Sequence, residues 1–446
     1  KLEFRRAHLA LPATARAQNR LQLTGQVDST HSNAITGSLQ LQADALDLTA
    51  YYDMIVTNLA APTGPAAAGA APAPAPAQPP SAPSTTPPAP SPAPSELTVL
   101  PFKDLSLRAT VGRCWLREVE MTNLTATLTL NSNRIDIRPV QAALNGTPAQ
   151  ATVEVDLSVR GYQYALEFQA RDVPLAPLVN SFQPDYKGAV SGTATAFLQL
   201  KGINFAESGL QKNLAGQFDL QTTNLNLALE RAKIPVLDTV IGTVRELPQL
   251  LTKLPGGLGG VVGAALGARP EFVAWTNALA QSPINAIVAR ATAGAGRVQF
   301  QRASVQSPAF IADLSGTLTL APALTNSTLD MPVQLALHRS LAEKIKLVPA
   351  GTPPEASFVA LRPFLKVGGT LGQTKREIDT KALLAMVAES SAGIPGLKDT
   401  PAGDLLRKFS GAAGGATPPS PATVTNGPAT NKPPVNPLDL LPKFRR

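Results

Sequence analysis

The chain has 446 residues, including 42 prolines and 33 glycines, and only 5% of its residues are aromatic. Charged residues make up 16%, below the level of an ordinary soluble domain, so the composition argues against two densely packed globular enzymes. The formal net charge is +8, but the Lys and Arg residues are scattered. Nucleic-acid-binding domains gather such residues into a patch, so we expect no nucleic-acid partner.

The first segment, residues 1–60, contains strand-like pieces and is predicted to be the end of a preceding β repeat. Because the chain begins at Lys1 in the middle of this pattern, we expect it to be a fragment of a longer protein. Residues 61–95 carry no charge and consist mainly of Ala, Pro and Ser. Such a segment cannot bury a core, so it is predicted to be a disordered linker.

Residues 96–390 are predicted to form one β domain. The stretch "ATVEVDLSVRGYQYALEFQA", residues 151–170, alternates apolar and polar residues on both sides of Gly161. Side chains alternate between the two faces of a strand, so this stretch predicts two strands that are apolar on one side. Similar segments separated by turn residues follow one another, which predicts a long, curved antiparallel sheet in a mainly β protein with a few helices.

Two regions break this pattern with helical periodicity. Residues 226–282 are predicted to hold a helical insert, with Leu237, Ile241 and Val244 on one face and a bend near Pro235. A second helix is predicted within residues 379–408, capped by Asp379. The segment 391–446 is predicted to continue this short helix into a disordered tail that is rich in Pro and Gly. No apolar run reaches the roughly 18 residues that a membrane-spanning helix requires.

The sequence carries no catalytic motif. His8, His31 and His338 are far apart, and Cys114 is the only cysteine, so neither a CxxC metal site nor a disulfide within the chain can form. We therefore expect no catalytic residue, no metal and no cofactor. An enzyme such as a carbohydrate-active β protein would need clustered carboxylates and exposed aromatic residues, and this alternative is poorly supported.

The apolar side of so many strands needs a cover. The helices of the insert are too few to cover it, and the apolar residues are mostly aliphatic, which suits fatty acyl chains because these need area and no directional bonds. We therefore predict an open hydrophobic groove. Its predicted lining residues are Leu128, Leu130, Val153, Val155, Leu157, Val159, Tyr164, Leu166, Phe168, Leu198, Leu200, Phe218 and Leu220. The alternative is a closed β-sandwich that acts as a scaffold in outer-membrane protein assembly or secretion.

The order of these segments resembles the C-terminal region of the AsmA-like family, which includes the TamB-like and YhdP-like bridge proteins. The resemblance is carried by four stretches that cover most of residues 20–385: "LQADALDLTAYYDM", "LPFKDLSLRATVGRCWLREVEMTNLTATLTLNSNRIDIRPVQAALNGTPAQATVEVDL", "GAVSGTATAFLQLKGINFAESGLQKNLAGQFDLQTTNLNL" and "FLKVGGTLGQTKREIDTKALL". Two features depart from the family pattern, the long Pro-rich insert at residues 61–95 and the absence of an N-terminal anchor from this chain.

The resemblance implies a periplasmic protein of the bacterial envelope, held in the inner membrane through a segment that this chain lacks. It implies a β groove that shields phospholipid acyl chains between the inner and outer membranes, and a role in outer-membrane biogenesis. Outer-membrane components are further partners that the resemblance suggests.

Overall fold

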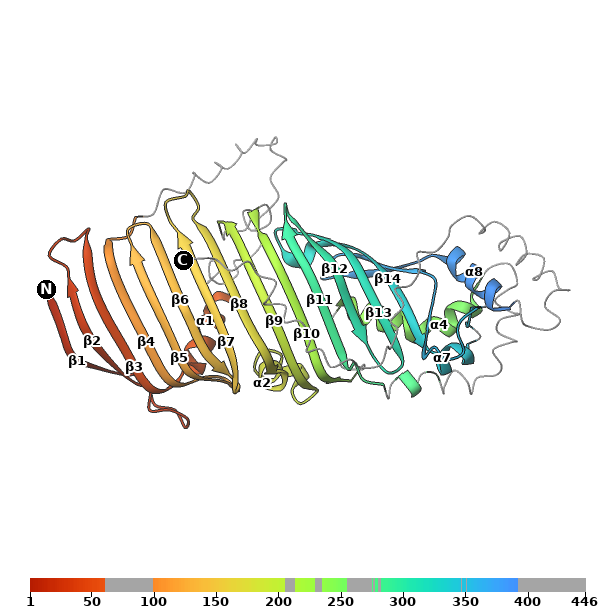
Figure 1. Ribbon diagram of the computed structural model, residues 1–446, viewed down its shortest axis with the longest axis horizontal. Helices are drawn as coiled ribbons and strands as arrows, with labels where there is room; N and C mark the ends of the chain where they lie inside the picture. The colour runs from red at the N-terminus through yellow and green to blue at the C-terminus, as the bar shows by residue number, and fades with distance from the viewer. Residues whose placement is uncertain are drawn as a thin grey trace, which may run out of the picture.

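The computed structural model describes residues 1–60, 99–204, 213–228, 235–254, 275, 277–279, 282–345, 347–349 and 351–391. Within these residues, 17 strands form one sheet, and the strands stand side by side along the long axis of the molecule (Figure 1). The predicted linker at 61–95 lies outside the described residues, and so does the predicted tail beyond residue 391.

The elements follow in chain order. They are β1 (Leu2–Ala10), β2 (Arg20–Asp28), β3 (Ile35–Asp47), α1 (Thr49–Ala60), β4 (Phe102–Leu116), β5 (Val119–Asn131), β6 (Arg134–Leu144), β7 (Thr147–Asp156), β8 (Gln163–Pro174), α2 (Leu175–Phe182), β9 (Val190–Ile203), β10 (Ala215–Leu227), α4 (Pro235–Thr252), β11 (Ala286–Gly294), β12 (Arg297–Gln306), β13 (Phe310–Thr319), β14 (Thr328–His338), α7 (Arg339–Lys344), β15 (Phe358–Ala360), β16 (Leu365–Gly369), β17 (Thr374–Ile378) and α8 (Thr380–Ser391). Short 3-10 turns lie at Pro184–Tyr186 and Leu324–Asn326.

The predicted mainly β fold is confirmed, and almost every strand pairs antiparallel with its neighbour in the chain. The exception is β3, which runs parallel to β4. Parallel neighbours cannot be joined by a tight hairpin and need a crossover, which here starts with α1. The strand that precedes the Pro-rich segment therefore belongs to the same sheet as the strand that follows it.

The sheet is open and uncurled along its length. Closing a sheet requires strand tilt and staggered registers that bring its edge strands together. Here β1 pairs with β2 and β17 pairs with β16, and the two strands lie at opposite ends of the row.

Three strands bend at the same end of the sheet. Register shifts occur at Asn123 in β5, Asp172 in β8 and Asn224 in β10, where φ is 53°, 50° and 51°. Asn and Asp tolerate this left-handed conformation better than other residues with a side chain, and a strand bends at such a bulge. Near these bends, β8 leads into α2 and β10 leads toward α4, while α1 follows β3 at the same end.

Helices cover the far part of the sheet, from β11 onward. Side chains from α4, α7 and α8 pack against one face of β13, β14 and β16, in a core that includes Leu247, Trp275, Leu335 and Val367, each 1% exposed or less. Helix α4 begins at Pro235, so this residue starts the helix instead of bending it. Proline suits the first turn of a helix because the N–H that it lacks would have no partner there.

Candidate functional site

One face of the sheet is apolar from β3 to β9. The strand registers bring one apolar side chain from each strand into a line that runs across the sheet. We call this line the central row; it consists of Leu39, Leu107, Leu128, Ile137, Val153, Leu166 and Leu200. Because side chains two positions apart share a face of a strand, parallel rows lie on both sides of it.

The neighbouring rows have the same character. Leu105, Leu130, Ile135, Val155 and Tyr164 form one of them. Ala109, Ala126, Val140, Ala151, Phe168, Leu198 and Phe218 form the other. All residues of the central row remain partly exposed, so the described residues form no second layer that removes them from water.

Most of the predicted lining residues lie on this face. Leu220 belongs to a further row, beside Ala196 on β9. Leu157 and Val159 lie outside the strand, because β7 ends at Asp156. The Asp156 carboxylate accepts hydrogen bonds from the backbone N–H of Ser158, at 2.9 Å, and from its hydroxyl. This local turn ends the strand at Asp156, directly before Leu157 and Val159 would extend the alternation.

Nine members of the apolar face were not among the predicted lining residues, and five of them are leucine or isoleucine: Leu39, Leu105, Leu107, Ile135 and Ile137. Their alternation is visible in the sequence, but the strand partners that place them in line with Leu128 and Val153 follow from the register. Two predicted residues are buried: Leu157 at 8% exposure and Tyr164 at 4%. The Tyr164 ring lies over Gly202 of β9, where a Cβ atom would come within 2.4 Å of the hydroxyl oxygen.

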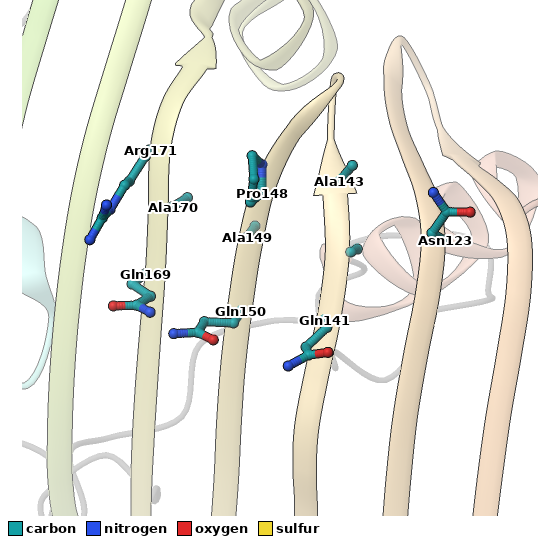
Figure 2. Close-up of a pocket in the computed structure, with 10 residues that line it drawn as sticks. Asn123, Gln141, Ala143, Pro148, Ala149, Gln150, Gln169, Ala170 and Arg171 are labelled. Carbon is teal, nitrogen blue, oxygen red and sulfur yellow. The ribbon is translucent and has the colours of Figure 1, made fainter.

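The opposite face carries the charges. Arg134 pairs with Asp136 at 2.9 Å and with Glu154 at 2.9 Å, and Arg138 also pairs with Glu154. Gln141, Gln150 and Gln169 lie in register on β6, β7 and β8. Figure 2 shows them in line along a shallow depression of about 520 Å³. The sheet is therefore polar on one side and apolar on the other.

The apolar face ends at a set of helices, at the end of the sheet that we call the helical margin. There α1, α2 and α4 follow β3, β8 and β10. Val111, Ala170, Val173 and Ala194, which belong to the strands at this margin, are buried. The apolar side chains at the helical margin are thus removed from water, whereas those of the central row remain partly exposed.

Arg117, in the turn between β4 and β5, joins the helices at this margin. Its guanidinium group lies 2.7 Å from the Asp53 carboxylate of α1 and donates a hydrogen bond to the Ser181 carbonyl of α2. It also stacks 5.3 Å from the ring centroid of Tyr52 and 6.0 Å from that of Phe182. A polar depression of about 450 Å³ beside it is lined by residues of both charges. Since Arg117 contacts both helices, it holds α1 and α2 in place.

Asp47 stabilises the start of α1. Its Oδ1 accepts a hydrogen bond of 3.1 Å from the Thr49 N–H, and its own N–H donates to Asn19 over 2.7 Å. Burial raises the pKa of the Asp47 carboxyl, but hydrogen bonds from Thr49 and Thr14 outweigh it, so the pKa lies below its usual value of 3.8. The ionised form is therefore the one that the folded state favours.

We expect Asp47→Ala to lower the free energy of unfolding by about 1 kcal/mol at neutral pH, as for other lost helix caps. Because the pKa is lowered in the folded state, this contribution is present above the unfolded-state pKa and disappears as the pH falls through the folded-state value. Urea unfolding of both proteins from neutral pH down to pH values below 3.8 tests this. A difference that stays constant over the whole range would show that the charge of Asp47 contributes nothing.

The described residues contain no group of three or more His, Cys, Asp and Glu side chains that could hold a metal ion. Among the helices that the structure describes, none has the length and apolar character needed to cross a membrane. Cys114 is buried, and burial is the main reason why the pKa of its thiol is raised. A raised pKa keeps a thiol in its unreactive protonated form at neutral pH.

Comparison with known proteins gives one match. The model of the AsmA family matches residues 23–227, the segment that runs from within β2 to the end of β10. No curated protein and no solved structure matches the chain. AsmA proteins are envelope-associated and are not known as an enzyme family. The match confirms the resemblance seen in the sequence: residues 23–227 match the AsmA family, which is consistent with an AsmA-like protein.

Proposed function

We propose that this chain is a non-enzymatic, periplasmic lipid-binding protein that contributes to phospholipid transport between the inner and outer membranes and to outer-membrane biogenesis. Phospholipid acyl chains lie against the apolar face formed by the central row and its two neighbours. The observation that carries this proposal is the line of partly exposed aliphatic side chains from Leu39 to Leu200, which no second sheet of the described residues covers.

The energetics favour such an occupant. Acyl chains need apolar area and no hydrogen-bond partners, and each methylene removed from water stabilises the complex by about 0.8 kcal/mol. A chain of about sixteen carbons would therefore contribute on the order of 10 kcal/mol before the cost of ordering it. AsmA membership supports a role in the lipid-related biogenesis of the envelope. A scaffold with a closed sandwich core would instead need a second sheet, and the strands of the described residues belong to one.

The test compares two double variants on the same two strands. Leu128→Gln with Val153→Gln places two polar groups in the central row. Thr129→Gln with Thr152→Gln places the same groups one residue away, on the polar face. The full chain is expressed in bacteria and purified, and the phospholipid that copurifies is quantified by mass spectrometry. We expect the first variant to carry several-fold less lipid and the second to carry as much as the parent protein, with unchanged strand content by circular dichroism.

Two results would contradict the proposal. One is parent protein that carries no phospholipid and also fails to take up a fluorescent fatty acid. The other is an equal loss of lipid in both double variants, which would mean that polarity on either face acts through folding instead of through contact with acyl chains.

A further inference from the structure

The two ends of the strands differ, and the difference bears on how an acyl chain would lie on the apolar face. At the helical margin, Val111, Val173 and Ala194 are 3%, 3% and 8% exposed. At the opposite end, which we call the turn margin, are the start of β4 and the turns 132–133 and 157–162. The row of the apolar face nearest to this margin remains partly exposed at three residues: Leu105, Leu130 and Ile135.

The partly exposed part of the face has a definite length along the strands. The face spans six residues along the strand, from Leu105 to Val111 on β4 and from Val155 to Ala149 on β7. Six residues of a strand correspond to a length of about 20 Å. An extended chain of about sixteen carbons has a similar length, so the face accommodates it parallel to the strands. The partly exposed part of the face ends at Val111, which is 3% exposed.

Exposed cations lie at the turn margin, beside the partly exposed end of the apolar face. Lys103 and Arg160 lie at the turn margin and are exposed, and neither forms an ion pair with any residue in the described ranges. Asp104 and Asp156 lie nearby, and Asp156 accepts hydrogen bonds from Ser158. At the helical margin, Arg117 and Lys187 are paired with Asp53 and Glu118, whereas Arg16 and Arg171 are exposed and have no ion-pair partner among the described residues. The turn margin thus combines exposed, unpaired cations with the partly exposed end of the apolar face.

We infer that bound phospholipids lie parallel to the strands, with the headgroup phosphate at the turn margin near Lys103 and Arg160 and the methyl ends of the acyl chains toward the helical margin. This inference rests on the proposed function and adds the orientation of the lipid to it. Lipids then lie side by side along the row of strands, and each presents its headgroup to water at one side of the sheet. The helical margin stops the chains, so it also limits the acyl length that the face covers.

Tryptophan fluorescence quenching by brominated phospholipids tests the orientation. Leu130→Trp and Ala126→Trp place an indole at two depths on the same face of β5, four residues apart. Thr129→Trp, on the polar face of the same strand, is the matched control. Each full-length variant is loaded with phosphatidylethanolamine brominated either near the headgroup or near the methyl end of its chains, and the quenching of the parent protein is subtracted.

We expect the indole at position 130 to be quenched about twofold more by bromine near the headgroup, and the indole at position 126 by bromine near the methyl end. The control should be quenched by neither lipid. A reversed pattern, or the same preference at both positions, would overturn the orientation while leaving lipid binding intact. Absence of quenching at both apolar positions would contradict the proposed function itself.

Discussion

Replacing Leu335 by alanine is expected to lower the free energy of unfolding by about 2–5 kcal/mol, the range found for leucines in closed cores. Leu335 lies on β14 beneath the helices and is 1% exposed. Leu128→Ala, on the partly exposed part of the same sheet, is expected to cost about 1 kcal/mol, because its side chain has less apolar area to lose. Guanidinium-induced unfolding of both variants, with the lipid removed beforehand, measures the two values.

This contrast tests the division of the apolar face into two parts. The register leads from Leu220 through Ala289 and Ala303 to Leu314 and Val333, so one apolar face continues from the partly exposed strands to those beneath the helices. Equal costs at Leu335 and Leu128 would mean that the central row is packed as tightly as the core under α4. That outcome would remove the surface on which the lipid proposal depends.

Gly316→Ala is expected to destabilise the protein by about 3 kcal/mol, the cost of strong backbone strain together with a local clash. Gly316 lies in β13 with φ at +129°, a conformation that residues with a side chain rarely adopt. A Cβ atom there would lie 2.1 Å from the Asp330 carbonyl oxygen of β14. The strands would have to separate, so we expect faster amide hydrogen exchange in β13 and β14 in addition to the loss of stability.

Gly294→Ala is the matched control for this substitution. Gly294 ends β11, and a Cβ atom at this position has no neighbour within 4 Å. The change should therefore alter the stability by less than about 0.5 kcal/mol. If Gly316→Ala were equally mild, β13 would have to accommodate a side chain by changing its register with β14, and the exchange pattern of the two strands would reveal it.

Features that depend on neighbouring residues were predictable from the sequence. The alternation in residues 151–170 predicted β7 and β8 and the face to which Val153, Val155, Leu166 and Phe168 belong. The three-and-four spacing of Leu237, Ile241 and Val244 predicted the buried side of α4. The end of β7 was harder to predict, because the hydrogen bonds from Ser158 to Asp156 compete with an apolar pattern that continues through Leu157 and Val159.

The sequence by itself determined the class of this protein: mainly β, with strands apolar on one side, and AsmA-like in the order of its segments. These properties follow from periodicity and turn residues, which act over a few positions in the chain. Only the tertiary structure decided that β3 runs parallel to β4, that the sheet stays uncurled and that helices cover β11–β17. Register and coverage depend on contacts between residues far apart in the chain, and alternation within one strand contains no information about which strand or helix will lie against it.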